Sequence, residues 1–356
     1  MSKTLRLFIA FSIVPQILFI KILSSYPYWV EENYSNMVYP KISNALRLLY
    51  GWVPFSVGDL LYITAIGYVL WWFFTHRKKV LKSPRKTIVD LLSTASILYF
   101  VFHVFWGLNY YRLPLHKKQN INPIYTTEQL IQTTRKITAF TNKVHLKLVK
   151  DSSAIVIIPS DFDVLKKKSV KGYLNSARIY PYLKYKNPSQ KLSLLSMPLT
   201  YMGFSGYLNP FTNEAQVNYK APTNSLALTL AHEQAHQLGY AAESEANFIA
   251  FLATYQHSDL HIKYAAYSFA LRYCLVELSN RNKKVFEEIK EEVNPGILTD
   301  FENRSMHWAQ YKNPLEPLFK SIYNNFLKAN AQDKGIKSYS YVVGLIVGHY
   351  EAQPDH

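Results

Sequence analysis

Two histidines and a glutamate in one short apolar segment suggest the clearest chemistry in this sequence. His232, Glu233 and His236 form an HExxH pattern within the run LALTLAHEQAHQLGYAAESEANFIAFLA at residues 226–253. Residues four apart share one face of a helix, so both imidazoles could bind the same tetrahedral Zn²⁺. Glu233 directly follows the first ligand and could act as the base that takes a proton from an activated water. The pattern therefore predicts zinc-dependent hydrolysis.

HExxH also occurs by chance in ordinary helices, so the interpretation depends on a third ligand. Gly239 allows the first helix to end, and a second helix with apolar residues at 246, 249, 250 and 253 begins near Glu243. At 100° per residue Glu243 lies about 60° from Ala246 on the inner side of this helix, whereas Glu245 lies about 100° away on the other side. We therefore predict Glu243, rather than Glu245, as the third ligand. Solvated charges in a first helical turn are the alternative for both glutamates.

The spacing of Glu243, Ala246 and Asn247 resembles the E-x-x-A-D pattern of membrane zinc peptidases of the gluzincin group. The resemblance implies that Glu243 is the third ligand. It also implies that Asn247 stands where these enzymes have an aspartate that supports the site through a hydrogen bond, and Asn in place of Asp is a departure. The metzincin pattern HExxHxxGxxH matches through Gly239 and fails at Ala242.

Upstream of the motif, MGFSGYLNPFTNEAQVNY at residues 202–219 ends in an alternating run that predicts a strand. In zincins an edge strand near the metal pairs with extended substrate, so this segment is a candidate substrate wall. An ordinary sheet strand is the alternative. A side chain that stabilises the oxyanion must come from elsewhere in the fold, and the sequence does not choose among Tyr201, Tyr240, His261 and His307.

Three apolar stretches, at roughly 5–23, 58–75 and 88–107, are long enough to cross a bilayer, which takes about 17 to 25 residues. The second ends in Trp71 and Trp72 and is followed by a basic loop from Arg77 to Lys86. Basic loops stay in the cytoplasm, so the N-terminus and this loop are predicted to lie inside. We therefore expect a multi-pass protein of the inner or plasma membrane, with the chain after about residue 108 outside the cytoplasm.

The remaining chain has the pattern of a folded domain. A helix is predicted at 126–149, with a capping box formed by Thr126 and Gln129. The stretch 153–220 mixes short β-like runs such as AIVII and KLSLL with turn residues, most of 223–336 has a helical pattern, and VVGLIVG at 342–348 suits a buried closing segment. The expected fold is an N-terminal three-helix transmembrane anchor (1–108) plus a mainly helical α+β zincin-like metalloprotease domain (109–356).

Composition limits the possible partners. The single cysteine, Cys274, excludes an intramolecular disulfide and any cysteine-cluster metal site. Lys and Arg outnumber Asp and Glu by 40 to 24, but the lysines are spread over the domain without a nucleic-acid-binding motif. The expected partners are therefore the lipid bilayer and a peptide or protein substrate near its surface, with no nucleic acid.

Taken together, the three spans, GFSGYLNPFTNEAQVN and HEQAHQLGYAAESEANFIAF resemble the bacterial membrane family known as domain of unknown function 3810. The resemblance covers nearly the whole chain, is most specific at 202–253, and implies a zinc-peptidase relationship without an established substrate. The leading hypothesis is a membrane-anchored zinc metallopeptidase. The alternatives are a membrane-tethered binding or sensory protein with a structural zinc site, and a zinc hydrolase of a non-peptide amide.

Overall fold

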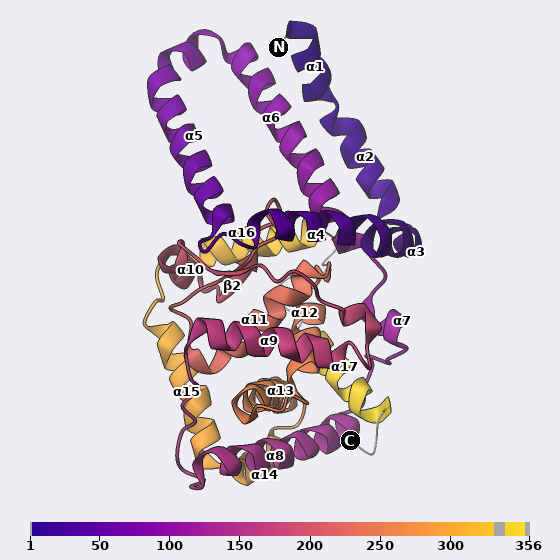
Figure 1. Ribbon diagram of the computed structural model, residues 1–356, viewed down its shortest axis with the longest axis vertical. Coiled ribbons are helices and arrows are strands. Elements are labelled where there is room, and N and C mark those ends of the chain that lie inside the picture. Colours follow the sequence, from indigo (N-terminus) through magenta and orange to yellow (C-terminus); the bar gives the residue numbers. More distant parts are fainter. Residues whose placement is uncertain (1, 331–338, 353–356) are drawn as a thin grey trace.

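Three apolar helical segments rise from one side of the molecule (Figure 1). The computed structural model describes residues 2–330 and 339–352. Segments that are long and apolar enough to cross a membrane are Lys3–Leu23, Val57–Lys78 and Pro84–Phe105, which confirms the three predicted spans. They are built from α1 (Lys3–Phe11), α2 (Ile13–Leu23), α5 (Val57–Lys82) and α6 (Pro84–Phe105). The N-terminus and the turn between α5 and α6 lie at the same far end of these helices (Figure 1).

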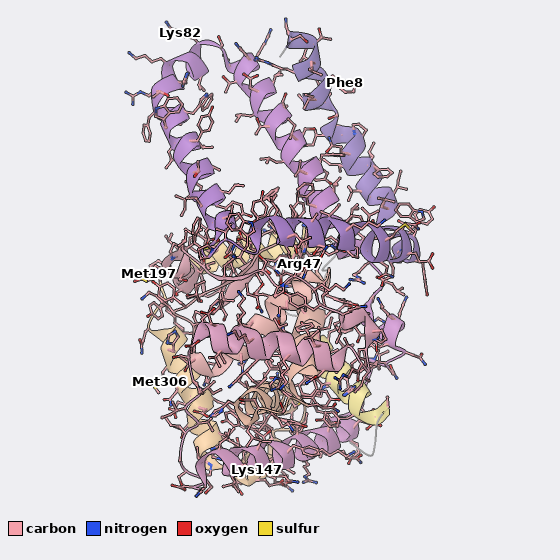
Figure 2. All side chains as sticks on the ribbon, viewed as in Figure 1. Phe8, Arg47, Lys82, Lys147, Met197 and Met306 are labelled. Carbon is pink, nitrogen blue, oxygen red and sulfur yellow. The ribbon has the colours of Figure 1, made fainter. Side chains whose placement is uncertain are left out.

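The spans present apolar side chains outward, as a lipid environment requires. Phe8 of α1 is 71% exposed and points away from the neighbouring helices (Figure 2). Between the spans, α1 and α6 are joined by an ion pair from Arg6 to Asp90 at 3.1 Å. Polar contacts of this kind hold helices together where no hydrophobic driving force acts between them.

A helical elbow connects the first and second spans. It consists of α3 (Pro27–Trp29), the π-helical η1 (Val30–Val38) and α4 (Tyr39–Tyr50), and it crosses the base of the spans (Figure 1). Its aromatic residues Tyr28, Trp29 and the nearby Trp52 are 62%, 49% and 79% exposed. Tryptophan and tyrosine favour the headgroup level of a bilayer, so these residues mark the expected membrane surface.

The domain that follows α6 is mostly helical, and its core lies around α13. Thr126 and Gln129 form the predicted capping box at the start of α8, and the apolar run of α17 is buried as expected. The helical elements are η2 (Gly107–Tyr111), α7 (Leu115–Gln119), α8 (Thr127–Val149), α9 (Phe162–Ser176), η3 (Pro181–Leu183), α10 (Ser196–Met202), α11 (Thr223–Gln237), α12 (Glu243–Thr254), α13 (Leu260–Arg281), α14 (Lys283–Glu292), α15 (Pro295–Ala309), α16 (Glu316–Ala329) and α17 (Tyr339–Ala352).

A three-stranded sheet completes the domain, in the order β1-β3-β2. The strands are β1 (Gln190–Leu192), β2 (Gly206–Leu208) and β3 (Ala215–Val217), with β1 parallel and β2 antiparallel to β3. The predicted strand at the end of 202–219 is therefore present as β3. However, β3 is the central strand and fully buried, and the edge strands are β1 and β2, of which β2 also lies within 202–219.

The predicted β-like run AIVII is not a strand. Within residues 154–158, Val156 and Ile158 are buried while Ile157 is 80% exposed, so the segment is extended against the helical core without a neighbouring strand. Alternating burial arises here from packing on helices, and it is indistinguishable in sequence from the alternation of a sheet strand.

Candidate metal centre

The HExxH segment lies at the C-terminal end of α11, which turns sharply into α12. Gly239 makes this turn with a φ of +85°, and a Cβ there would come within 2.9 Å of both Tyr39 and Asn109. Only glycine meets both conditions without strain. Four residues further on, α12 begins at Glu243, and the two helices pack against each other.

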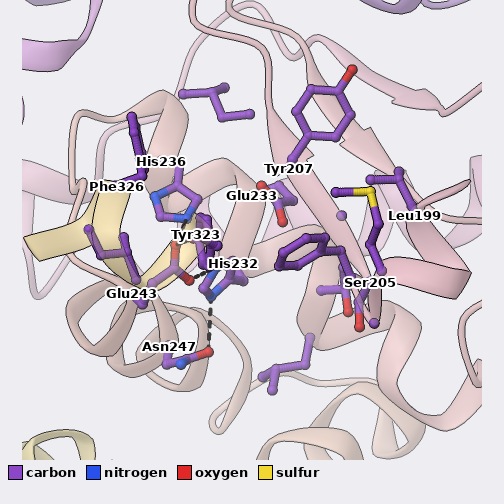
Figure 3. Close-up of a pocket in the computed structure, with 18 of the residues that line it drawn as sticks. Leu199, Ser205, Tyr207, His232, Glu233, His236, Glu243, Asn247, Tyr323 and Phe326 are labelled. Atoms are coloured by element: carbon purple, nitrogen blue, oxygen red, sulfur yellow. Dashed lines mark hydrogen bonds and ion pairs between the residues drawn. The ribbon is translucent and has the colours of Figure 1, made fainter. Parts of the chain in front are cut away.

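This turn brings together the side chains of His232, His236 and Glu243, whose ligand atoms all lie within 4.8 Å of one another (Figure 3). Nε2 of His232 is 3.3 Å from one carboxylate oxygen of Glu243, and Nε2 of His236 is 3.7 Å from the other. The hydrogen bonds and the charges of the two histidines outweigh the effect of burial and lower the pKa of Glu243 to about 2. The carboxylate is therefore ionised at neutral pH.

Both imidazoles are oriented through their other ring nitrogen. Nδ1 of His232 donates to Oδ1 of Asn247 at 3.0 Å, and Nδ1 of His236 donates to the backbone carbonyl of Tyr240 at 2.7 Å. A neutral imidazole that donates from Nδ1 carries a lone pair on Nε2, and both Nε2 atoms face Glu243. Burial and the neighbouring His232 lower the pKa of His236 to about 4, which favours the neutral ring, whereas the hydrogen bond to Glu243 and its charge outweigh burial and raise the pKa of His232. Two imidazole nitrogens and one carboxylate are a donor set suited to Zn²⁺ with one position left open.

Glu233 points into the cavity beside the cluster. It is 3% exposed, and its Oε2 has no hydrogen-bond partner among the described residues. Burial, with a contribution from Glu243, raises the pKa of Glu233 to about 8. Such an unpaired buried carboxylate is costly unless a ligand, a cation or a water occupies the space it faces.

Glu245 lies away from this cluster. Its carboxylate accepts a hydrogen bond from the backbone N–H of Leu115 at 2.6 Å, and its pKa is raised to about 7 by burial. The two glutamates at the start of α12 thus face different surroundings, since Glu243 faces the histidines and Glu245 faces α7.

A tyrosine that the sequence did not single out contacts the cluster. Tyr323 of α16 donates a hydrogen bond to Oε1 of Glu243 at 2.6 Å, across 80 residues of chain. Among the described residues that line the cavity, Tyr323 and Tyr110 appear, whereas Tyr201, Tyr240, His261 and His307 do not. No local pattern marks Tyr323, because only tertiary packing brings α16 to α12.

The cluster opens into a cavity of about 780 Å³. Its walls include the edge strand β2, and Gly206 lies so close to Glu233 that a Cβ there would be 2.8 Å from its Oε1. Figure 3 shows Tyr207, Ser205 and Leu199 on one side of Glu233 and the histidines on the other.

The elbow is bonded to the same turn from the membrane side. Tyr39 donates to the carbonyl of Gln237 at 3.1 Å, and Ser43 donates to it at 3.0 Å. Arg112 donates to the carbonyl of Gly239 at 2.9 Å and forms a two-bond ion pair with Glu31, at 2.8 and 2.9 Å. The end of the HExxH helix is therefore held by residues of the elbow and the segment after α6.

These features define a multi-pass membrane protein with a mostly helical domain and a buried cluster of two histidines and a glutamate. The chain belongs to the family described as protein of unknown function (DUF3810), which matches residues 34–347. The match includes most of the elbow, two of the spans and the whole cluster. No curated protein and no solved structure matches the chain.

Proposed function

We propose that this protein is a membrane-anchored zinc-dependent peptidase. His232, His236 and Glu243 hold the zinc, and Glu233 is the general base. Zinc held there polarises a scissile carbonyl and lowers the pKa of a water molecule. Hydrolysis breaks the amide C–N bond, adds the hydroxyl of water to the carbonyl carbon and transfers a proton to the amine nitrogen.

The observation that carries the proposal is the convergence of three ligand atoms within 4.8 Å beside an unpaired buried carboxylate. Glu233 can accept the proton of water at Oε2 and deliver it to the leaving amine, because no other described group competes for that oxygen. Asn247 and the carbonyl of Tyr240 keep the imidazoles in one tautomer and orientation.

The edge strand β2 favours a peptide over other amides. Asn218 N–H bonds to Ser205 C=O at 2.9 Å, and Asn209 N–H bonds to Glu214 C=O at 3.0 Å. By the alternation of an antiparallel ladder, the N–H and C=O of Gly206 and Leu208 then point away from β3. An extended polypeptide can pair with this free edge directly beside Glu233.

The orientation in the membrane is part of the proposal. The basic loop after α5 and the N-terminus lie together at the far end of the spans (Figure 1). Since loops rich in Lys and Arg remain in the cytoplasm, the domain lies on the opposite side.

The test compares the purified wild-type protein with Glu233→Gln and His232→Ala, using zinc content by elemental mass spectrometry and hydrolysis of a peptide library. We expect Glu233→Gln to keep its zinc and lose turnover by about a thousandfold or more, as expected when a general base is removed. His232→Ala should lose both. Undiminished hydrolysis by Glu233→Gln would refute the mechanism, and a zinc-replete protein whose cellular role survives Glu233→Gln would favour the binding or sensory alternative.

A further inference from the structure

The cavity that contains Glu233 reaches the membrane-spanning helices. Its lining includes Tyr62 of α5, Phe102 of α6 and Trp106 just after α6. Tyr62 is three residues beyond Asp59, whose carboxylate accepts hydrogen bonds from Ser193 and from the N–H of Leu194 in the domain, so it lies roughly 4.5 Å further along α5 at 1.5 Å per residue. One wall of the cavity is therefore made of residues at the junction between the domain and the apolar spans.

The edge strand leads from the base to this wall. Gly206 lies against Glu233, and the ring of the next residue, Tyr207, stacks on Tyr62 with centroids 6.3 Å apart. Phe211, at the turn after β2, meets the edge of the same Tyr62 ring at 6.4 Å. A polypeptide paired with β2 at Glu233 would thus pass beside α5 after a few residues.

Exposed apolar side chains also lie on two helices of the domain, α16 and α10. On α16, Leu318 and Ile322 are 54% and 59% exposed, and they are four residues apart on one helical face. Met197 of α10 is 43% exposed. Both helices lie in the layer of the domain nearest to the spans (Figure 1), where exposed apolar groups can contact lipid.

From this geometry we propose that the substrate is a membrane-anchored polypeptide. Its scissile bond lies within about five residues of a bilayer-spanning segment, and an extended chain advances about 3.3 Å per residue. This inference rests on the proposed peptidase function. The free edge of β2 is complementary to a peptide backbone, and the aromatic wall of Tyr62, Phe102 and Phe211 is complementary to the apolar residues where such a segment enters the bilayer.

The test uses the full-length protein with zinc in liposomes and two libraries that share a randomised segment. In one library the segment is followed by a leucine-rich membrane span, and in the other by a soluble domain. We expect Glu233-dependent cleavage of the membrane-anchored library to exceed that of the soluble library by about tenfold or more, because apolar contacts discriminate by such factors. The cleavage sites should lie next to the span.

Tyr62→Ala should reduce this preference, whereas Phe74→Ala should not, since Phe74 lies on the same helix but is 61% exposed and outside the cavity. Equal cleavage of both libraries, or sites scattered far from the span, would overturn the substrate class and leave the peptidase function standing. Hydrolysis of an N-acylated lipid amide alone, added as a third substrate, would overturn it in favour of a lipid.

A binding measurement separates this inference from the catalytic proposal. In the Glu233→Gln background, a photo-crosslinking amino acid replaces Tyr62, or Phe74 as the control. Crosslinks from position 62 to the membrane-anchored library, but not to the soluble library, support the substrate class even if wild-type protein hydrolyses neither. Absence of such crosslinks, or equal crosslinks from both positions, would refute it.

Discussion

At the scale of single residues, two neighbouring glutamates of α12 face different surroundings, and the proposed metal site needs only one of them. Glu243 faces both imidazoles, whereas Glu245 accepts the N–H of Leu115. We expect wild type and Glu245→Gln to contain close to one zinc per chain and Glu243→Gln to contain much less. Elemental mass spectrometry of protein purified without chelators measures this. Zinc loss with Glu245→Gln and not with Glu243→Gln would reverse the assignment.

Tyr323 provides a second prediction at this scale. Its hydroxyl donates to Glu243 at 2.6 Å and fixes the carboxylate from the side of α16. Loss of a hydrogen bond to a ligand typically weakens metal affinity by about 10- to 100-fold. Tyr323→Phe should therefore weaken zinc binding in a competition titration with a chelator. Tyr311→Phe is the matched control, because Tyr311 packs on Tyr201 and His307 outside the cavity. Equal affinities for all three proteins would exclude this role.

At the scale of elements, a glycine allows β2 to lie against Glu233, the proposed general base. A Cβ at Gly206 would lie 2.7 Å from the carbonyl of Gln216 and 2.8 Å from Oε1 of Glu233, so either the strand or the carboxylate must move. Gly206→Ala should leave zinc content unchanged and lower kcat/KM about 100-fold, as expected for a misplacement of about 1 Å. Gly67→Ala, where a Cβ meets nothing within 4 Å, should have no effect. Steady-state kinetics on one responsive peptide measure both, and unchanged turnover by Gly206→Ala would show that the strand is free to shift.

The elbow is tied to the domain by a buried ion pair whose contribution depends on pH. Burial by itself raises the pKa of Glu31, but Arg112 and Lys118 lower it to about 2. Because the folded pKa is below the unfolded value, the stabilisation is complete above about pH 4.5 and is lost as the pH falls toward about 2.

We expect Glu31→Gln to lower the free energy of unfolding at pH 7 by on the order of 3 kcal/mol, since it leaves Arg112 buried without its partner. The difference from wild type should shrink as the pH falls below about 4.5. Thermal unfolding in detergent across this pH range measures it. Glu292→Gln is the control, because its pair with Arg135 is half-exposed and contributes little. A difference in the free energy of unfolding that stays constant with pH would contradict the expected link between stability and the protonation of Glu31.

At the scale of the whole molecule, the orientation of the spans determines on which side of the membrane the domain lies. Cys274 is completely buried, so single cysteines introduced at the surface can be labelled with little background. A membrane-impermeant maleimide applied to intact cells should label Lys284→Cys in α14 and should label Lys82→Cys at the α5–α6 turn only after permeabilisation. The reverse pattern would place the domain in the cytoplasm.

At the same scale, the elbow and the spans contribute residues to the candidate metal centre. The elbow, α5 and α6 supply Tyr39, Tyr62 and Phe102 to the turn and the cavity of the metal centre. Removal of residues 1–108 would therefore expose the centre and remove part of its wall. The predicted division at residue 108 follows composition and stays a prediction.

The sequence by itself determined the features that depend on near neighbours in the chain. The spans follow from long apolar runs, the capping box at Thr126 follows from residues three apart, and the pairing of His232 with His236 follows from helical periodicity. Each is governed by local geometry, which sequence spacing encodes directly.

Tertiary structure alone decided the features that depend on distant segments. Tyr323 reaches Glu243 across 80 residues, and β3 is the central strand while β2 lies at an edge, because order in a sheet is set by pairing between strands. The elbow was not predicted either, since its buried residues, such as Tyr39 and Glu31, find their partners only on α11 and after α6. Contacts between segments far apart in the chain leave no periodicity in either segment, and so they become visible only once the chain is folded.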